Sequence, residues 1–255
     1  MLQALVFDLD GTLVDTEELH RRAFNQAFRE FALGWNWDAP LYAELLSVSG
    51  GAERIARYID RLELSAAEKT GLRRLVPALH RTKTRIFGEL VASGVRARPG
   101  VARLVAEAHA AGLRVGVVAS SAAANALALL TAALGPALAT AVSATVTAEQ
   151  VARRKPAPDL YELVLATLRV PAAAAIAFED SANGVAAAKA AGLRVIATPS
   201  RWTDGQDFSR ADLRLPSLGE PDAPLDRETQ RALGAPWVDL ALLRRRFEPA
   251  RFATA

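Results

Sequence analysis

The 255-residue chain contains no cysteine. This absence excludes disulfide bonds, thiolate catalysis and cysteine-based metal sites, and it is typical of proteins from reducing compartments. We therefore expect a cytoplasmic protein. Lysine is also rare, since only Lys69, Lys83, Lys155 and Lys189 occur among 31 cationic residues. A lysine in a loop marked by glycine or proline is then a candidate functional residue, because arginine does not replace a compact ammonium group.

A strong charge of one sign and a membrane-spanning run are missing as well. The formal net charge is only +3, which does not indicate a nucleic-acid partner. The amino terminus shows no signal-peptide pattern. No charged residue occurs from Val115 to Ala148, but Ser120-Ser121, Asn125 and Gly135-Pro136 interrupt this alanine-rich stretch. We therefore predict strands and a packed helix there and no membrane partner.

The order of the apolar runs predicts an α/β fold. Ala4 to Phe7 is a short apolar run, as expected for a buried parallel strand. From residue 101 onward, helical and strand patterns alternate, which predicts a Rossmann-like doubly wound parallel sheet. Helices are predicted at 101–111, 122–134, 158–168, 185–191 and 237–247, and strands at 114–121, 141–146, 174–178, 194–198 and 212–215.

A helical block interrupts this alternation. Residues 16–93 show helical periodicity and no strand pattern, so we predict an inserted helical cap. Asp15 or Thr16 is expected to cap its first helix, and Pro77 is a candidate interruption of its longest helix. The predicted domains are an α/β core (1–15 and 94–218), the helical cap (16–93) and a C-terminal extension (219–255).

Polar residues stand where the predicted strands end. Asp8 and Asp10 follow the first strand, and alternate strand residues face the same side, so both carboxylates point into the crevice where open α/β sheets bind ligands. Two convergent carboxylates attract a divalent cation. Ser120, Glu179 and Asp180 hold similar positions, and Lys155 lies in a loop marked by Pro156. Taken singly, Ser120 is also a good helix N-cap, and Lys155 an ordinary surface cation.

Four segments together resemble the motifs of the haloacid dehalogenase superfamily of phosphotransferases. They are Phe-Asp-Leu-Asp-Gly-Thr-Leu-Val-Asp-Thr at 7–16, Val-Ala-Ser-Ser at 118–121, Arg-Lys-Pro-Ala-Pro at 154–158 and Phe-Glu-Asp-Ser at 178–181. The resemblance covers residues 1–218. It implies that Asp8 is the nucleophile that forms an aspartyl-phosphate and that Asp10 is the general acid and base. It also implies that Ser120 and Lys155 bind the phosphoryl group.

The same resemblance implies a metal cofactor. Mg²⁺ suits a site made of oxygen ligands. The resemblance assigns it to Asp8, Asp180 and the main-chain carbonyl of Asp10, with Glu179 nearby in a supporting role.

Segments 16–25, 34–38 and 49–55 of the cap are similar to CbbY-type phosphatases of photosynthetic and carbon-fixing organisms. Characterised members of that family hydrolyse xylulose 1,5-bisphosphate, an inhibitor of Rubisco, to xylulose 5-phosphate. The resemblance implies a small phosphorylated sugar as the substrate. The implied substrate-binding residues are Glu17, His20, Tyr42, Gly51, Arg54 and Ser121. The chain departs from the family pattern at Ala52, where lysine is common, and in the tail after Asp226.

The cap also contains a pattern that suggests a site for a second phosphate. Gly50-Gly51 precedes a predicted helix with Arg54 in its first turn, and free N–H groups, the helix dipole and a guanidinium favour an anion there. The alternative is an ordinary glycine loop before a solvated helix.

Three other functions remain open at this point. A β-phosphoglucomutase-type phosphotransferase would return the phosphoryl group to a bound hexose, and a broad-specificity sugar-phosphate phosphatase would use the same core. A non-catalytic binding protein is disfavoured because Asp8, Asp10, Lys155 and Asp180 are all present. We expect a monomer.

Overall fold

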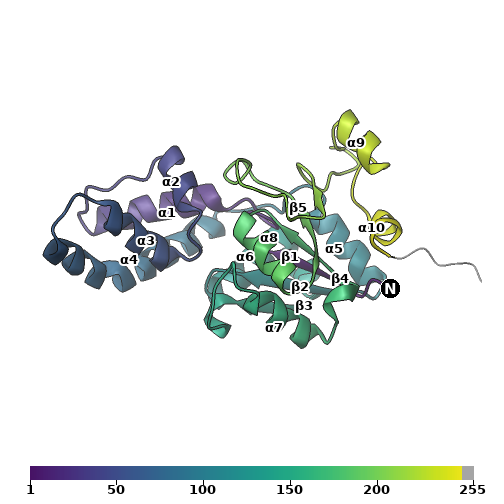
Figure 1. Cartoon of the computed structure of the whole chain (residues 1–255), viewed down its shortest axis with the longest axis horizontal. Coiled ribbons are helices and arrows are strands. Elements are labelled where there is room, and N and C mark those ends of the chain that lie inside the picture. The colour runs from purple at the N-terminus through teal and green to yellow at the C-terminus, as the bar shows by residue number, and fades with distance from the viewer. Residues whose placement is uncertain (249–255) are drawn as a thin grey trace, which may run out of the picture.

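The computed structural model describes residues 1–248, and a six-stranded sheet forms its centre (Figure 1). The strand order is β3-β2-β1-β4-β5-β6, and all neighbours are parallel. The strands are β1 (Ala4–Asp8), β2 (Arg114–Ala119), β3 (Val142–Thr147), β4 (Ala175–Glu179), β5 (Arg194–Ala197) and β6 (Leu213–Arg214). The predicted doubly wound parallel sheet is confirmed. Its first strand lies between β2 and β4, so the carboxyl ends of these three strands meet.

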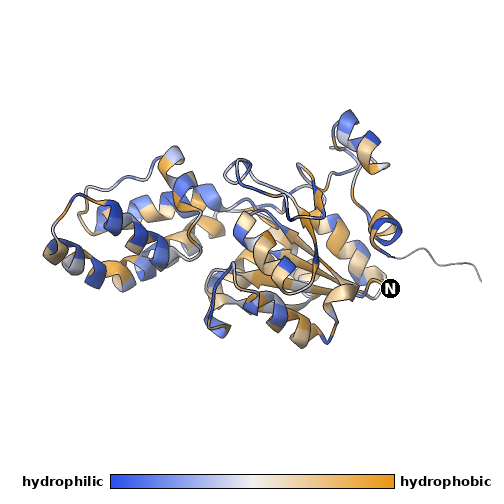
Figure 2. Cartoon of the chain, viewed as in Figure 1, coloured by the Kyte–Doolittle hydropathy of each residue, from blue (hydrophilic) through white to orange (hydrophobic). Residues whose placement is uncertain are grey.

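Helices cover both faces of the sheet. One face packs against α5 (Val101–Ala110), α6 (Ala123–Ala139) and α10 (Leu240–Phe247), and the other against α7 (Asp159–Leu168) and α8 (Ala182–Ala190). All five residues of β1 are therefore buried, which explains its uninterrupted apolar run. Figure 2 shows the central strands largely in the apolar colour.

Four helices lie between β1 and α5 and project from one end of the sheet (Figure 1). They are α1 (Glu17–Glu30), α2 (Ala39–Leu45), α3 (Gly51–Arg61) and α4 (Ala66–Ala92). Their aromatic core includes Phe24, Phe28 and Trp37, all fully buried. Where the chain leaves and re-enters the core, Val14 and Ala97 form an antiparallel bridge. We keep the term helical cap for residues 16–93.

Two helices differ from the sequence expectation. Pro77 lies inside α4, which continues to Ala92 without interruption. The helix predicted to end at Leu134 is followed by a kink at Gly135, whose φ of 77° is not helical, and a further turn extends α6 to Ala139. Two short 3₁₀ turns, at 148–150 and 172–174, complete the core.

The C-terminal extension packs against its own core. It contains a helix that the sequence did not predict, α9 (Arg227–Leu233), while α10 begins at Leu240, where the Asp239 side chain caps it. Leu225, Leu233 and Leu243 are buried in the cluster beside the sheet. Residues 249–255 of the predicted extension lie outside the described part. Within residues 1–248, no helix combines the length and apolar character needed to cross a membrane.

Candidate active site

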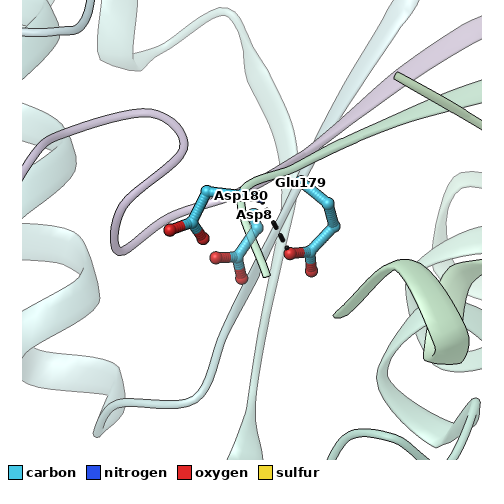
Figure 3. Close-up of side chains that lie close together, drawn as sticks. All are labelled: Asp8, Glu179 and Asp180. Atoms are coloured by element: carbon cyan, nitrogen blue, oxygen red, sulfur yellow. Dashed lines mark hydrogen bonds between the residues drawn. The ribbon is translucent and has the colours of Figure 1, made fainter. Parts of the chain in front are cut away.

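Three buried carboxylates converge where β1 and β4 end (Figure 3). Asp8 ends β1, while Glu179 and Asp180 stand at the end of β4, and oxygens of all three lie within 4.8 Å of one another. The register of the two strands causes this meeting. Phe7 pairs with Phe178, and the stacked rings have centroids 4.5 Å apart, so the next residues of both strands lie side by side.

Lys155 is the cation of this cluster. Its Nζ donates hydrogen bonds to Asp8 Oδ1 and Glu179 Oε1, both at 2.5 Å. Tyr161 also donates to Glu179 Oε1, at 2.6 Å, from the first turns of α7. Burial alone would lower the pKa of Lys155, but the two carboxylates raise it above its ordinary value. The side chain therefore remains an ammonium group.

The charges of the cluster fit a divalent cation. Three carboxylates and one ammonium group leave two negative charges without a partner in the cluster. Burial, followed by repulsion from Glu179, raises the pKa of Asp180 to about 8 and holds the pKa of Asp8 well above its ordinary value. A bound cation would reverse both shifts, and carboxylate oxygens are the ligands that Mg²⁺ takes.

Two glycines make room for these carboxylates. A Cβ on Gly184 would lie 2.0 Å from the Glu179 carboxylate, and one on Gly11 would lie 2.3 Å from Asp180 Oδ2. Gly11 also has a φ of +90°, which disfavours other residues. The Glu179 carboxylate is fully buried, and its Oε2 accepts from the Ser181 hydroxyl and from the Asp180 amide.

Asp10 contacts a chain of residues from the helical cap. Its Oδ1 accepts from the Thr16 hydroxyl at 2.7 Å and lies 2.9 Å from His20 Nε2. Nδ1 of His20 lies 2.7 Å from Lys83 Nζ. An ammonium group can only donate, so Nδ1 accepts and the Nε2–H of His20 donates to Asp10. Thr16 occupies the N-cap position of α1, but its hydroxyl serves Asp10, so the expected side-chain cap is not formed.

The same contacts set the ionisation of these groups. Burial alone would raise the pKa of Asp10, but His20, Thr16 and Lys83 hold it well below its ordinary value. Burial and the nearby Lys83 lower the pKa of His20, and burial lowers the pKa of Lys83 to about 8. At neutral pH the chain therefore consists of a carboxylate, a neutral imidazole and an ammonium group.

A cavity of about 80 Å³ lies between the core and the helical cap. Seven of the predicted site residues line it: Asp8, Asp10, Ser120, Lys155, Asp180, Glu17 and Arg54. Five others are not among its lining residues, namely His20, Tyr42, Gly51, Ser121 and Glu179. Ligand sites commonly enclose about 300–1,000 Å³. The cavity is therefore smaller than a typical ligand site, so the cap must move to make room for a sugar bisphosphate.

Tyr42 does not line the cavity itself but contacts two cap residues that do. Its hydroxyl donates to Glu17 Oε2 at 2.6 Å and accepts from Arg54 Nη1 at 3.1 Å. The other guanidinium nitrogens of Arg54 donate to main-chain oxygens of Leu45 and Val48. Gly51 begins α3 and faces away from the cavity, because a Cβ there would lie 2.9 Å from the His80 ring. The structure thus places Tyr42 between Glu17 and Arg54, two of the cap residues that line the cavity.

Sequence reasoning did not assign several residues that the structure brings to the site. Lys83 contacts His20, and Tyr161 contacts Glu179. Thr203 lines the cavity, and so does Asn183, whose amide donates to Ser47 O in the cap. The rarity of lysine was the one signal that pointed toward Lys83.

Comparisons with known proteins agree with this geometry. A family model for haloacid dehalogenase-like hydrolases matches residues 2–192. Protein CbbY of Cupriavidus necator is 44% identical over 95% of this chain and 96% of its own length. The structure of CbbY from Rhodobacter sphaeroides in complex with phosphate is 42% identical, with a TM-score of 0.78 over 86% of this chain and 96% of that chain. A mutant of that protein in complex with xylulose-(1,5)bisphosphate gives a TM-score of 0.79 over the same shares.

Proposed function

Because the chain belongs to the haloacid dehalogenase-like hydrolases, we propose that it removes one phosphate from a small sugar bisphosphate, and first of all from xylulose 1,5-bisphosphate. The enzyme is a phosphatase, that is, a phosphoric monoester hydrolase. The bound xylulose bisphosphate of the Rhodobacter sphaeroides relative supports this substrate. The observation that carries the proposal is one cavity with Asp8, Lys155 and Asp180 at the core end and Glu17 and Arg54 at the cap end.

In the proposed reaction, an Asp8 oxygen attacks phosphorus, and the bond from phosphorus to the sugar oxygen breaks. Lys155, 2.5 Å from Asp8, offsets the charge of the nucleophile and of the phosphate, and Ser120 binds a phosphoryl oxygen. The product of this step is an aspartyl-phosphate. Water then attacks its phosphorus, so Asp8 is released and inorganic phosphate leaves.

Asp10 is proposed to move the protons of both steps. In its protonated form it donates a proton to the departing sugar oxygen, and the carboxylate formed in this way then takes one from the attacking water. Within residues 1–248, the hydrogen bonds to its carboxylate end on Oδ1. We therefore assign the proton transfers to Oδ2. The depressed pKa of Asp10 keeps it a carboxylate at neutral pH, which is the form that accepts a proton in the second step, so Asp10 must take up a proton from the substrate phosphate or from solvent before the first step.

Mg²⁺ is the proposed cofactor. Asp8, Asp180 and the main-chain carbonyl of Asp10 would hold it. Glu179 instead accepts hydrogen bonds from Lys155 and from the Tyr161 hydroxyl. When bound, the cation neutralises charge on the phosphate oxygens. Without it, this neutralisation is missing and the raised pKa of Asp8 keeps the nucleophile protonated, so the reaction is expected to stop in EDTA.

A phosphate-release screen over sugar mono- and bisphosphates tests the proposal. Xylulose 1,5-bisphosphate is expected to give the highest kcat/KM, with xylulose 5-phosphate and free phosphate as products. Asp8→Asn is expected to abolish turnover, because an amide is not a nucleophile of this kind. Turnover by Asp8→Asn would contradict the assigned nucleophile, and conversion of a hexose 1-phosphate into its 6-phosphate would favour the mutase alternative.

Arg54 offers a separate test of the second phosphate site. Arg54→Ala is expected to raise KM for the bisphosphate about 10- to 100-fold, because a charged hydrogen bond contributes about 1.5–3 kcal/mol. The KM for a sugar monophosphate should stay nearly constant. Equal losses on both substrates would remove the distal-phosphate assignment.

A further inference from the structure

Trp202 belongs to the core by sequence but packs within the helical cap. Among the buried residues of the cap's aromatic cluster, Trp202 is the one that comes from outside residues 16–93. Its side chain is 7% exposed, and its ring meets the Tyr42 ring edge-on, with centroids 5.4 Å apart and an interplanar angle of 88°. In Figure 1 the loop that follows β5 runs from the sheet toward the cap.

The base of this loop is fixed to the core. Arg98 donates to the main-chain oxygens of Thr198 and Pro199, and it also donates to Gly11 O beside the catalytic aspartates. The loop is therefore anchored at residues 198–199, and Trp202 at its tip contacts the cap.

The same loop holds one oxygen of Asp180. Ser200 Oγ and Thr203 Oγ1 donate to Asp180 Oδ2 at 3.4 and 3.2 Å. The amide of Trp202 donates to Ser200 Oγ at 3.3 Å. One short segment thus connects an indole ring in the cap with a carboxylate of the proposed metal site.

The position of Trp202 depends on the position of the cap. The cavity of about 80 Å³ is smaller than a sugar bisphosphate needs, so substrate entry requires the cap to move. Such a movement would change the contact between the Tyr42 and Trp202 rings. The ring contact links the loop tip to the cap, together with an ion pair between Arg201 and Glu18. Loss of it loosens Ser200 and Thr203 and with them the orientation of Asp180 Oδ2.

We propose that Trp202 is a positioning residue that couples closure of the helical cap to the orientation of Asp180 in the metal site. The proposal rests on the proposed function, since it takes Asp180 as a ligand of Mg²⁺. Trp202 itself is not among the residues that line the cavity. It acts through Ser200 and Thr203, so the metal site is well ordered only when the cap is seated.

A double-mutant cycle on Mg²⁺ affinity tests the coupling. Isothermal titration with Mg²⁺ alone is carried out on the wild type, Trp202→Ala, Thr203→Val and the double variant. Trp202→Ala and Thr203→Val are each expected to weaken Mg²⁺ binding about 3- to 10-fold, and the double variant should bind more tightly than the product of the two single effects predicts, because Ser200 provides a second route from Trp202 to Asp180. Trp237→Ala, which removes an indole from the C-terminal extension, should leave the affinity unchanged.

A second pair of variants reaches the same contact from the cap side. Tyr42→Phe keeps the ring that contacts Trp202 and should retain Mg²⁺ affinity. Tyr42→Ala removes this ring and should weaken Mg²⁺ binding as much as Trp202→Ala does. This pair replaces the cycle if Trp202→Ala does not fold.

The outcomes separate this inference from the proposed function. Independent, multiplying effects of Trp202→Ala and Thr203→Val would overturn the coupling. An unchanged Mg²⁺ affinity in Trp202→Ala, or in Tyr42→Ala where that pair is used, would overturn it too. A wild-type protein that neither binds Mg²⁺ nor releases phosphate would instead overturn the proposed function.

Discussion

Replacement of Lys83 by methionine is expected to make the enzyme more stable and slower. Lys83 is only 6% exposed, and its ammonium lies over the rings of Phe24 and Phe87, 4.9 and 5.0 Å from their centroids. Its polar partner is His20 Nδ1, at 2.7 Å. Methionine fills a similar space without the charge.

The gain in stability can be worked out from the pKa of Lys83. Burial lowers this pKa from 10.5 to about 8, and each pKa unit corresponds to about 1.4 kcal/mol. Lys83 therefore opposes folding by about 3 kcal/mol at pH 7, because pH 7 lies below both pKa values and the ammonium is present in both states. Loss of the hydrogen bond to His20 costs about 1 kcal/mol in return. The net gain of about 2 kcal/mol should raise Tm by about 5 °C.

The loss of activity follows from the chain that ends on Asp10. Without Lys83, the tautomer of His20 is no longer fixed, and the hydrogen bond from Nε2 to Asp10 weakens. A charged hydrogen bond contributes about 1.5–3 kcal/mol, so kcat should fall about 10- to 100-fold. Thermal unfolding followed by circular dichroism measures Tm, and phosphate release at saturating substrate measures kcat.

The control for Lys83→Met is Lys69→Met on the same helix. Lys69 is half-buried at the start of α4 and donates to Asp60 O at the surface, so both Tm and kcat should change little. A lower Tm for Lys83→Met would refute the assigned desolvation cost. An unchanged kcat would show that Lys83 does not support Asp10.

Two further predictions concern the carboxylate cluster. Gly184→Ala should abolish phosphatase activity, because the new Cβ would lie 2.0 Å from the Glu179 carboxylate. The control Gly205→Ala should retain activity, because no heavy atom lies within 4 Å of the position of its Cβ. An active Gly184→Ala enzyme would show that Glu179 can move freely. In EDTA, the free energy of unfolding and Tm should fall as the pH rises from 5.5 to 8. The reason is that the pKa of Asp180 is about 8 in the folded state and 3.8 in the unfolded chain. The folded state therefore binds more protons over this interval and loses stability as they dissociate. Addition of Mg²⁺ should reverse this fall in Tm, and in Asp180→Asn the fall should be smaller. A Tm that rises with pH in EDTA would contradict the raised pKa of Asp180.

The sheet could be predicted because its signals are local. A strand buried on both faces needs an uninterrupted apolar run, and β1 and β4 each supply one that stops at carboxylates. The helix α9 gave no such signal, because only Leu233 among its seven residues is buried. Pro77 wrongly suggested an interruption of α4, because the packing of this helix against α1 and α3 outweighs the low helix propensity of proline.

The cap side of the site could be predicted only in part. Arg54 and Glu17 reach the cavity as expected, because each stands in the first turn of a helix that begins there. Lys83 could not be placed, since its contact with His20 joins residues 63 positions apart. That contact depends on how α1 packs against α4, and neither helix pattern encodes its partner. Trp202 was missed for the same reason, because its cluster is built from another part of the chain.

The cap therefore contributes to the chemistry as well as to enclosure. His20 and Lys83 lie on α1 and α4, while the Asp10 that they hold ionised follows β1 in the core. When the cap withdraws, the contact between His20 and Asp10 lengthens, and the pKa of Asp10 returns toward its ordinary value. His20 and Lys83 therefore orient the Asp10 carboxylate only when the cap is closed. Closure on a sugar phosphate thus assembles the general acid and base together with the cavity that excludes bulk water.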